Sequence, residues 1–575
     1  MPVHNEDIAA IFDELADLLE IDEANPFRVR AYRNAARTVR SLGTELSEMV
    51  GRGEDLTRLP GIGKDLAAKI VEILDTGKAA ALTKLHKEVP ASLEQLLEVP
   101  GLGPKRVKAL YQELGIKTRK QLLAAARGHK LRALEGFGEK TEQRIIDNLA
   151  AERSSERRFL LATAVHYGEP LLAYLNKTRG VGEALIAGSY RRGRETVGDL
   201  DILVSATDHA EVMRRFVAYD EVEDVVSQGE TRATVILRSG LQVDLRVMDK
   251  QSLGAALHYF TGSKAHNIHV RRLGQQRGLK INEYGVFRGD ERIAGTTEAS
   301  VYKTLDLPYI PPELREDRGE LEAARDGKLP ELVELDDLQG DLHVHTDATD
   351  GQRPLQAMVE AARGRGLSYV AITDHSRRLT VAHGLDEKRL RAQLDAIDEL
   401  NANLKGFAVL KGVEVDILED GSLDLPDSVL GELDLVIGAV HSHFGLSRKK
   451  QTARIQRAMD GPHFSILAHP SGRLLLERDA YDVDMERLID HAAERGCFLE
   501  LDAQPKRLDL TDVYCQAARD AGVLVAVNSD AHAEADFDNL RFGIGQARRG
   551  WLEKQDVLNT RPLGALRRLL GSTLS

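Results

Sequence analysis

The chain has little cysteine and no long hydrophobic run. Only Cys497 and Cys515 occur among 575 residues. This excludes a disulfide framework and makes a reducing cytoplasm the expected location. No run of about 18 apolar residues exists, which excludes a membrane-spanning helix. The N-terminus lacks a basic segment followed by an apolar core, so we expect no export signal. These absences predict a soluble, cytoplasmic protein with no membrane partner.

The charge balance alone does not indicate a nucleic-acid partner. The formal net charge is −13 at pH 7. Acidic metal sites would contribute to that total, so local charge is the informative quantity. The length predicts three or more domains.

The first group of functional residues lies in a glycine-bounded turn and the strand after it. The segment 188–204 runs from Gly188-Ser189 through three arginines to Asp199-Leu200-Asp201 and an apolar run. Side chains alternate along a strand, so the two aspartates share one face, where a divalent cation would relieve their repulsion. Asp244 is expected on the returning arm of a hairpin over 235–247. Three carboxylates on neighbouring strands can hold two Mg²⁺ ions for phosphoryl transfer.

An isolated Asp-x-Asp pair is common and usually structural. Here the Gly188-Ser189 turn offers backbone N–H groups to a phosphate and the arginines offer charge, which favours a functional site. The segment resembles the active-site signature of the DNA polymerase beta superfamily, and its Gly-Ser-Tyr-Arg-Arg-Gly form resembles the X family of DNA polymerases. The resemblance implies that the metal ligands are Asp199, Asp201 and Asp244, with Asp244 as the base for the primer 3′-hydroxyl. It implies that Ser189, Arg192 and Gly198 hold the β- and γ-phosphates of the nucleotide.

A second X-family signature follows at Tyr259-Phe260-Thr261-Gly262-Ser263. The resemblance implies that Tyr259, Phe260 and Gly262 line the sugar side of the nucleotide pocket, exclude a 2′-hydroxyl and favour deoxynucleotides. It implies that Asn267 contacts the base and Arg271 the template strand. Lys264 and His266 depart from the pattern of some members, and Lys264 is expected to contact the nucleotide before DNA arrives. Without the family, Tyr259 and Phe260 are most simply core aromatics.

Three short Gly-x-Gly repeats punctuate the helical N-terminal part. Each follows one amphipathic helix and opens another, and its glycines permit a tight turn. The open N–H groups of the second helix can bind phosphate without reading sequence. One such turn is weak evidence, but three copies among lysines and arginines resemble helix-hairpin-helix modules that grip DNA. The glycines concerned are Gly61, Gly63, Gly101, Gly103, Gly136 and Gly138.

Lys69 raises the question of a lyase activity. In some X-family members the first of these modules belongs to a domain that removes a 5′-deoxyribose phosphate through a Schiff-base lysine. Lys69, eight residues after Gly61, stands at the corresponding position. A nucleophilic lysine needs burial or neighbouring cations. An ordinary phosphate contact explains Lys69 at least as well.

Beyond residue 336, apolar runs recur and each ends in potential metal ligands. Amphipathic helical segments such as 354–365 and 387–401 separate the runs, which predicts a parallel sheet. Seven such strands with ligands at their carboxyl ends predict a distorted (β/α)7 barrel with its active site at that face. Nine ligands share that end: His343, His345, Asp350, His375, Glu414, His441, His469, Asp530 and His532.

Mixed imidazole and carboxylate ligands suit Zn²⁺, Mn²⁺ or Fe²⁺ better than Mg²⁺. Nine ligands suffice for two or three ions. The set resembles the PHP (polymerase and histidinol phosphatase) domain, a phosphoesterase barrel with a trinuclear metal centre. Every ligand position of that family is filled, so we expect an active site. Asp347, His383 and His443 are candidates for contacts with the metal ligands or with the substrate, although a structural role is favoured for each.

The whole chain is expected to be a multidomain α/β protein. Its parts are helix-hairpin-helix DNA-binding regions, a nucleotidyltransferase palm with helical and mixed subdomains, and the PHP barrel. The expected boundaries are 1–88 for the N-terminal lyase-like domain, 89–152 for the helix-hairpin-helix subdomain, 153–248 for the palm, 249–318 for nucleotide selection, 319–336 for a linker, and 337–575 for the PHP domain.

The resemblance implies a template-directed, gap-filling DNA polymerase of base excision or end repair with a PHP 3′→5′ exonuclease. AP endonuclease, 3′-phosphatase and dRP lyase activities are further options. The expected partners are gapped or nicked DNA and dNTPs. Mg²⁺ or Mn²⁺ is expected at the polymerase site and a Mn²⁺, Zn²⁺ or Fe²⁺ cluster at the PHP site, in a monomer.

Three alternatives stay open. A template-independent nucleotidyltransferase is disfavoured by the three DNA-binding repeats and the Tyr259-Phe260 wall. A DNA-end-binding scaffold with inert sites is disfavoured by the two complete ligand sets. The third is a PHP domain that acts on a small phosphate ester.

Overall fold

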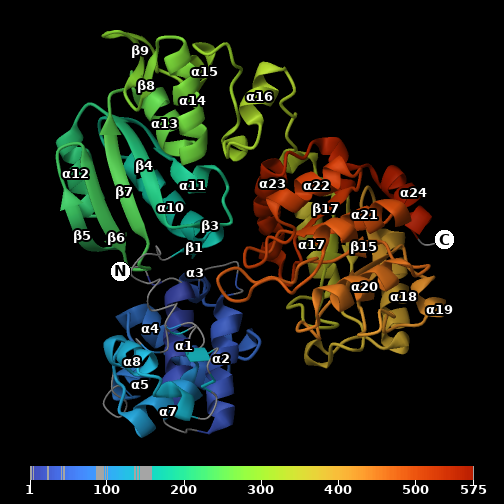
Figure 1. The fold of residues 1–575 in the computed structure, drawn as a ribbon. Coiled ribbons are helices and arrows are strands. Elements are labelled where there is room, and N and C mark those ends of the chain that lie inside the picture. Colours follow the sequence, from blue (N-terminus) through green and yellow to red (C-terminus); the bar gives the residue numbers. More distant parts are fainter. Residues whose placement is uncertain are drawn as a thin grey trace. The chain divides into compact units, whose positions relative to one another are not determined.

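The computed structural model describes residues 158–573 without a break. Before them it describes 3, 5–21, 25–40, 42, 46–85, 93, 96, 99, 102–134, 137–138, 141–142 and 145. The chain divides into two compact units, Met1–Arg157 and Arg158–Ser575, whose elements are drawn in Figure 1. Among the described residues, no helix combines the length and the apolar character needed to cross a bilayer.

The described part of the first unit is helical. Its α-helices are α1 (Asn5–Ile21), α2 (Pro26–Arg40), α3 (Leu46–Gly51), α4 (Lys64–Thr76), α5 (Ala80–Leu85), α7 (Pro104–Leu114) and α8 (Arg119–Arg127). The apolar stripe of α1 is buried, and Phe12 packs against Tyr32 of α2 with ring centroids 5.8 Å apart. The helical period seen in the sequence therefore reflects a packed core.

The Gly-x-Gly turns have the geometry that their sequence predicts. Gly61 has φ +73°, a left-handed conformation that favours glycine, and Gly63 is the N-cap of α4. Gly103 is the N-cap of α7 in the same way. In the third copy the N–H of Thr141 donates to the carbonyl oxygen of Gly138 at 2.9 Å, which begins a helical turn. Gly101 and Gly136 lie outside the described residues.

The second unit begins with a five-stranded sheet. Its strand order is β2 (Val181–Ile186), β4 (Asp199–Ala206), β7 (Gln242–Met248), β6 (Arg232–Leu237) and β5 (Val222–Gln228). Strands β6 and β7 form the predicted hairpin, whereas β4 and β7 run parallel. Helices α10 (Leu161–Asn176) and α12 (His209–Val217) share the buried core of this sheet. The short helix α11 (Gly188–Arg191) connects to β4 through β3 (Thr196–Val197), which pairs with β1 (Phe159–Leu160).

A mixed helical and antiparallel segment follows the sheet. It comprises α13 (Leu253–Thr261), α14 (Lys264–Gln276), β8 (Lys280–Asn282), β9 (Gly285–Arg288), β10 (Glu291–Ala294) and α15 (Glu298–Lys303). The segment 319–336, read from the sequence as a linker, contains helix α16 (Glu320–Arg325). Leu321 and Leu332 of that segment are buried in the same core as Tyr302. The chain is therefore packed, not extended, where it enters the last domain.

The last part is the predicted seven-stranded parallel barrel. Its strands in order are β11 (Gly340–Val344), β12 (Tyr369–Ile372), β13 (Ala408–Asp416), β14 (Leu435–Ala439), β15 (Ile466–Leu467), β16 (Phe498–Asp502) and β17 (Val525–Asn528). A parallel bridge between Val344 and Ala531 links the first strand to the segment after the last one. Neighbouring strands keep consecutive order, as the βα alternation of the sequence predicts.

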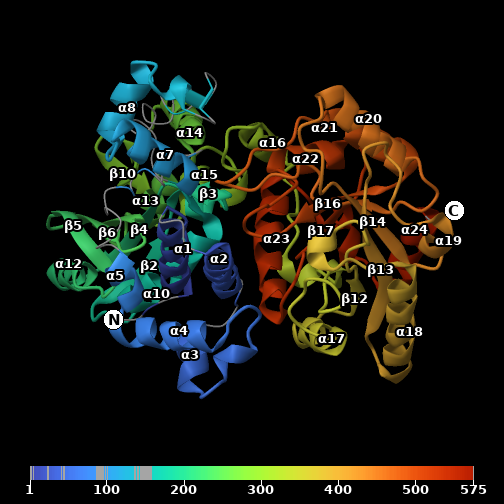
Figure 2. The same cartoon turned by 90° about the horizontal axis from the view of Figure 1, so that it is seen from below.

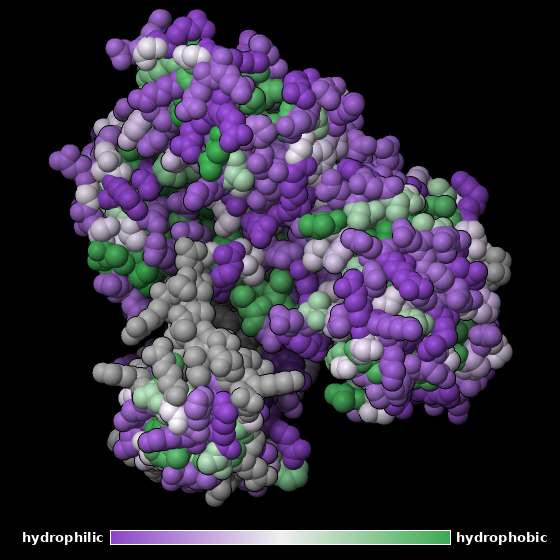
Figure 3. All heavy atoms as spheres, viewed as in Figure 1, coloured by the Kyte–Doolittle hydropathy of each residue, from purple (hydrophilic) through white to green (hydrophobic). Residues whose placement is uncertain are grey.

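Helices surround the barrel strands, as Figure 2 shows. They are α17 (Leu355–Gly364), α18 (Glu387–Asn403), α19 (Asp427–Leu430), α20 (Arg448–Met459), α21 (Met485–Arg495), α22 (Asp512–Asp520), α23 (Leu540–Arg549) and α24 (Leu563–Thr573). On the face drawn in Figure 3 most residues are hydrophilic, which agrees with the gathering of apolar side chains in the cores.

Candidate active sites

The three sheet carboxylates lie on neighbouring strands. Asp201 of β4 is the direct partner of Asp244 on β7, and Asp199 is the partner of Gln242. Burial raises the pKa of Asp201 to about 7, and the charges of Asp199 and Asp244 add to the shift. Because a bound divalent cation relieves such repulsion, these residues fit a metal site. Their ligand atoms are nevertheless less tightly gathered than those of the barrel described below.

Asp244 is held in place by hydrogen-bond donors from its own sheet. The hydroxyl of Thr234 donates to Oδ1 at 2.5 Å, and Nε2 of Gln242 donates to Oδ2 at 2.8 Å. Nη2 of Arg232 lies 3.4 Å from Oδ1. These contacts fix the orientation of a carboxylate that is almost fully buried.

The glycine turn lies directly against Asp201. The N–H of Ala187 donates to the backbone oxygen of Asp201 at 2.8 Å. Gly188 has φ +65°, and a Cβ at this position would lie 2.8 Å from Oδ2 of Asp201. Both the backbone conformation and the close approach therefore require glycine at the start of the turn.

The arginines of the turn are paired with acidic and polar groups of the next segment. Arg191 binds Glu298 through two hydrogen bonds of 2.8 and 2.7 Å and donates to the Thr261 hydroxyl. Arg192 donates through Nε to Glu316 at 3.0 Å and through Nη1 to the carbonyl oxygen of Thr261 at 2.7 Å. Arg191 is therefore occupied by a structural ion pair, and any ligand of Arg192 competes with Glu316.

The second signature forms the end of α13 and the start of α14. Tyr259 and Phe260 make an edge-on ring pair with centroids 5.1 Å apart. Nδ2 of Asn267 donates to the carbonyl oxygens of Tyr259 and Gly262, at 2.6 and 3.2 Å, and so ties the helix end together. Lys264 is exposed at the first position of α14.

Two further residues of this segment differ in their surroundings. Arg271 is exposed, and its Nε donates to the backbone oxygen of Asn267 at 3.3 Å. His266 is fully buried, 2.6 Å from Glu320 and 2.9 Å from the Tyr302 hydroxyl. His266 therefore has a packing role in the core.

In the first unit, Lys69 lies on α4 with its side chain 15% exposed. Its Nζ is 2.5 Å from Oδ1 of Asp65, one helical turn earlier. The charged group at this distance from the lysine is thus a carboxylate.

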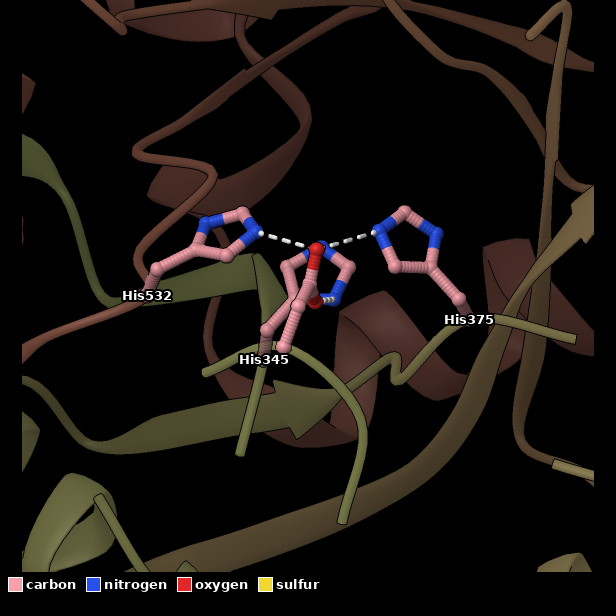
Figure 4. Close-up of side chains that lie close together, drawn as sticks. His345, His375 and His532 are labelled. Atoms are coloured by element: carbon pink, nitrogen blue, oxygen red, sulfur yellow. Dashed lines mark ion pairs between the residues drawn. The ribbon is translucent and has the colours of Figure 1, made fainter. Parts of the chain in front are cut away.

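The barrel ligands converge at one end of the strands. Three overlapping groups have ligand atoms within 4.8 Å of one another, and His345 and His375 each belong to two of them. Figure 4 shows His345, His375 and His532 directed toward one point. Oδ2 of Asp350 lies there, 3.3 Å from His375 and 3.5 Å from His532. The groups are His345-Asp350-His375-His532, His343-His345-Asp530 and His375-Glu414-His441.

Glu414 lies at the centre of the barrel ligands. It is buried, and imidazole nitrogens of His375, His441 and His469 lie 2.7, 3.2 and 3.0 Å from its oxygens. Burial disfavours the charged carboxylate, but the facing imidazoles of His375, His441 and His343 hold the pKa of Glu414 well below its usual range. A buried carboxylate among histidines is a typical metal environment.

Several ligand atoms point inward without a hydrogen bond. Among residues 158–573, these buried atoms include Nε2 of His343, both ring nitrogens of His345 and Nδ1 of His469. Buried polar atoms are normally satisfied, so the unsatisfied atoms fit the coordination of metal ions. His469 and Asp530 also have positive φ, +26° and +50°. Backbone strain of this kind concentrates at functional sites.

Sequence reasoning missed the residues that orient these ligands. Glu500 of β16 lies 2.7 Å from Nδ1 of His343, and Asp416 of β13 lies 2.5 Å from Nδ1 of His441. The spacing of Asp416, two residues after Glu414, could have indicated it because both side chains face the same way. Asp347 contacts Arg353 through its backbone, and His383 and His443 are left-handed loop residues.

Family models match the chain in five segments. They are a helix-hairpin-helix domain (residues 3–79), a SAM-like helix-hairpin-helix tandem (93–151), a DNA polymerase beta palm (168–272), a DNA polymerase beta thumb (256–316) and a PHP domain (341–504). Fold and sites together define a polymerase beta-like nucleotidyltransferase joined to a PHP barrel.

The chain is 40% identical to the DNA polymerase/3′-5′ exonuclease PolX of Bacillus subtilis over 98% of both chains. It is 25% identical to rat DNA polymerase lambda over 51% of this chain and 53% of the relative. It is 31% identical to a probable phosphatase of Caldanaerobacter subterraneus over 38% of this chain and 86% of the relative. A solved Leishmania infantum polymerase beta ternary complex is 22% identical, covers 39% of this chain and 98% of its own, and has a TM-score of 0.27. The chain therefore belongs to the X family of DNA polymerases with a C-terminal PHP domain.

Proposed function

We propose that the chain is a template-directed DNA polymerase that fills gaps during DNA repair and trims 3′ ends with its PHP barrel. The observation that carries the first activity is the pairing of Asp201 with Asp244 beside the Gly188 turn. Full-length similarity to a DNA polymerase/3′-5′ exonuclease supports the combination of both activities.

In this proposal the sheet carboxylates bind the reacting end of the DNA and the nucleotide. Asp199, Asp201 and Asp244 would hold divalent cations, Mg²⁺ or Mn²⁺, which stabilise charge on the transferred phosphate when bound. Asp244 would accept the proton of the primer 3′-hydroxyl.

The surrounding turn and helices would bind the incoming dNTP. The Gly188-Ser189 turn, Arg192 and Gly198 would bind its triphosphate, while Tyr259, Phe260 and Gly262 would exclude a 2′-hydroxyl. Lys264 and Asn267 would contact the nucleotide and Arg271 the template.

In the barrel, the nine converging side chains would hold a cluster of Mn²⁺, Zn²⁺ or Fe²⁺, which supplies activated water and charge stabilisation when bound. Glu500 and Asp416 would orient the imidazoles of His343 and His441. The helix-hairpin-helix glycines and the basic residues near them would hold the DNA backbone through open helical N–H groups. We propose a monomer, because every named site is built from one chain.

A gapped-duplex assay tests both activities at once. We expect the full chain to insert the templated dNTP and, without dNTPs, to shorten the 3′ end. Asp201→Ala should abolish insertion alone, and His343→Ala should abolish shortening alone. Insertion without a template strand would contradict the proposal in favour of an untemplated transferase.

A 3′-phosphatase activity of the barrel is a second candidate. Its support is the similarity of the barrel segment to a probable phosphatase. Release of inorganic phosphate from a 3′-phosphorylated gap by wild type, and not by His343→Ala, would establish it.

A further inference from the structure

Helix α23 of the barrel wall contacts the turn that carries Arg192. Arg549 ends α23, and its side chain is 1% exposed. Nη1 of Arg549 donates to the backbone oxygen of Arg192 at 2.9 Å and to Oε1 of Glu316 at 3.0 Å. Nη2 donates to Asp512 at 2.7 Å. The buried guanidinium of Arg549 thus joins the barrel to the turn that carries Arg192 and to the thumb.

Glu316 is shared between two arginines. Its Oε1 accepts from Nε of Arg192 at 3.0 Å as well as from Arg549. Two guanidinium groups on one carboxylate divide its negative charge, so each is held less strongly than it would be alone. Arg549 therefore weakens the hold of Glu316 on Arg192.

The barrel fixes the rest of the turn as well. Glu195 accepts hydrogen bonds from Arg473 at 2.7 Å and from Gln546 at 2.6 Å. Phe542 and Leu508 of the barrel are buried in the core of the five-stranded sheet. The turn at 192–195 is consequently held by the barrel on one side and by Thr261 and Glu316 on the other.

We infer that Arg549 is a positioning residue for nucleotide binding, through which the hydrolytic domain sets the affinity of the polymerase site for dNTPs. The inference rests on the proposed polymerase function. Without Arg549, the backbone of Arg192 loses its anchor and Glu316 draws the Arg192 guanidinium away from an incoming triphosphate. The loss falls on substrate binding, so it raises KM and leaves kcat nearly constant.

The test compares two adjacent arginines of the full chain in single-nucleotide gap filling. Arg549→Gln should raise the KM for dNTP about tenfold and change kcat less than about twofold. Arg548→Gln is the matched control. Arg548, the residue before Arg549 in α23, binds Glu313 and Glu334 at 2.8 and 2.6 Å, but these partners lie outside the turn. The KM of Arg548→Gln for dNTP should equal that of wild type, and both variants should keep the wild-type 3′-exonuclease rate.

The variant Glu316→Gln gives an independent test, in which the KM for dNTP should change in the opposite direction from that in Arg549→Gln. It releases Arg192 from a competing carboxylate, so the KM for dNTP should fall by about threefold. The Glu316→Gln measurement tests the inference if Arg549→Gln fails to fold, which thermal unfolding and loss of exonuclease activity would show. An unchanged KM in folded Arg549→Gln, or a raised KM in Glu316→Gln, overturns the inference while wild type still polymerises. A wild-type chain that inserts no nucleotide contradicts the proposed function as well.

Discussion

Glu500 Oε1 lies 2.7 Å from Nδ1 of His343, and both side chains are completely buried. The same carboxylate accepts hydrogen bonds from Nδ2 of Asn528 and from the backbone N–H of His469, each at 2.8 Å. With Nδ1 engaged, the imidazole of His343 presents Nε2 toward Glu414 and Asp530, at 3.5 and 3.7 Å. Glu500 therefore orients one metal-ligand candidate and anchors the backbone of another.

Glu500→Gln should reduce 3′-end hydrolysis about 10–100-fold and leave gap filling unchanged, because it weakens the orientation of His343 without removing a ligand. Metal content after dialysis should fall in parallel, measured by elemental analysis. Glu494→Gln, an exposed change on α21, is the control and should alter neither quantity. Full metal content and rate in Glu500→Gln would contradict a positioning role.

Asp201→Asn should abolish nucleotide insertion and, in the presence of a chelator, raise the thermal unfolding midpoint. The substitution removes one of three mutually repelling carboxylates that the fold holds together at a cost in stability. Mg²⁺ should raise the midpoint of wild type more than that of the variant, as scanning fluorimetry would measure. Asp220→Asn is the exposed control in the same sheet domain. A variant that is no more stable than wild type would show that repulsion at the site is negligible.

Most residues of the sheet carboxylate site and the barrel site could be predicted from the sequence, because metal ligands and turn glycines follow local sequence patterns. Asp199 and Asp201 share a strand, and barrel ligands recur at strand ends, so strand period and βα rhythm are enough to place them. The partners of those residues could not be predicted in the same way. The contacts of Glu316 with Arg192 and of Glu500 with His343 depend on how distant segments pack, and residue spacing in the sequence does not predict such packing. The buried environment of His266 was missed for the same reason.

His258 should make the second unit less stable in mild acid. It is fully buried, and burial, followed by the charges of Arg315, His266 and Arg191, holds its pKa well below 6.5. His258 therefore binds a proton in the unfolded chain at a pH where it stays neutral in the folded chain. The free energy of unfolding consequently falls as pH drops below about 6.5. The loss is about 1.4 kcal/mol for each pH unit until the folded pKa is reached.

The measurement for His258 is the thermal midpoint between pH 7.5 and 5.5. His258→Phe, which does not titrate, should flatten the decline relative to wild type. His209→Phe, a change at a half-buried position at the start of α12, provides the control and should decline like wild type. Equal declines in His258→Phe and wild type would rule out this histidine as the cause.

Gly188→Ala should eliminate gap filling, and Gly193→Ala should largely retain it. Both glycines have positive φ, +65° and +64°, so either alanine carries a backbone penalty of roughly 1–2 kcal/mol. Only at Gly188 would the new methyl group lie 2.8 Å from Oδ2 of Asp201, whereas at Gly193 it makes an ordinary 3.7 Å contact with Cδ of Arg549. Comparing the two variants separates backbone strain from displacement of the Asp201 carboxylate. Because the backbone strain is the same, it should lower the unfolding temperature equally in both, whereas only Gly188→Ala displaces Asp201. Insertion rates that fall equally in the two variants would mean that strain in the turn, and not the position of Asp201, limits the reaction.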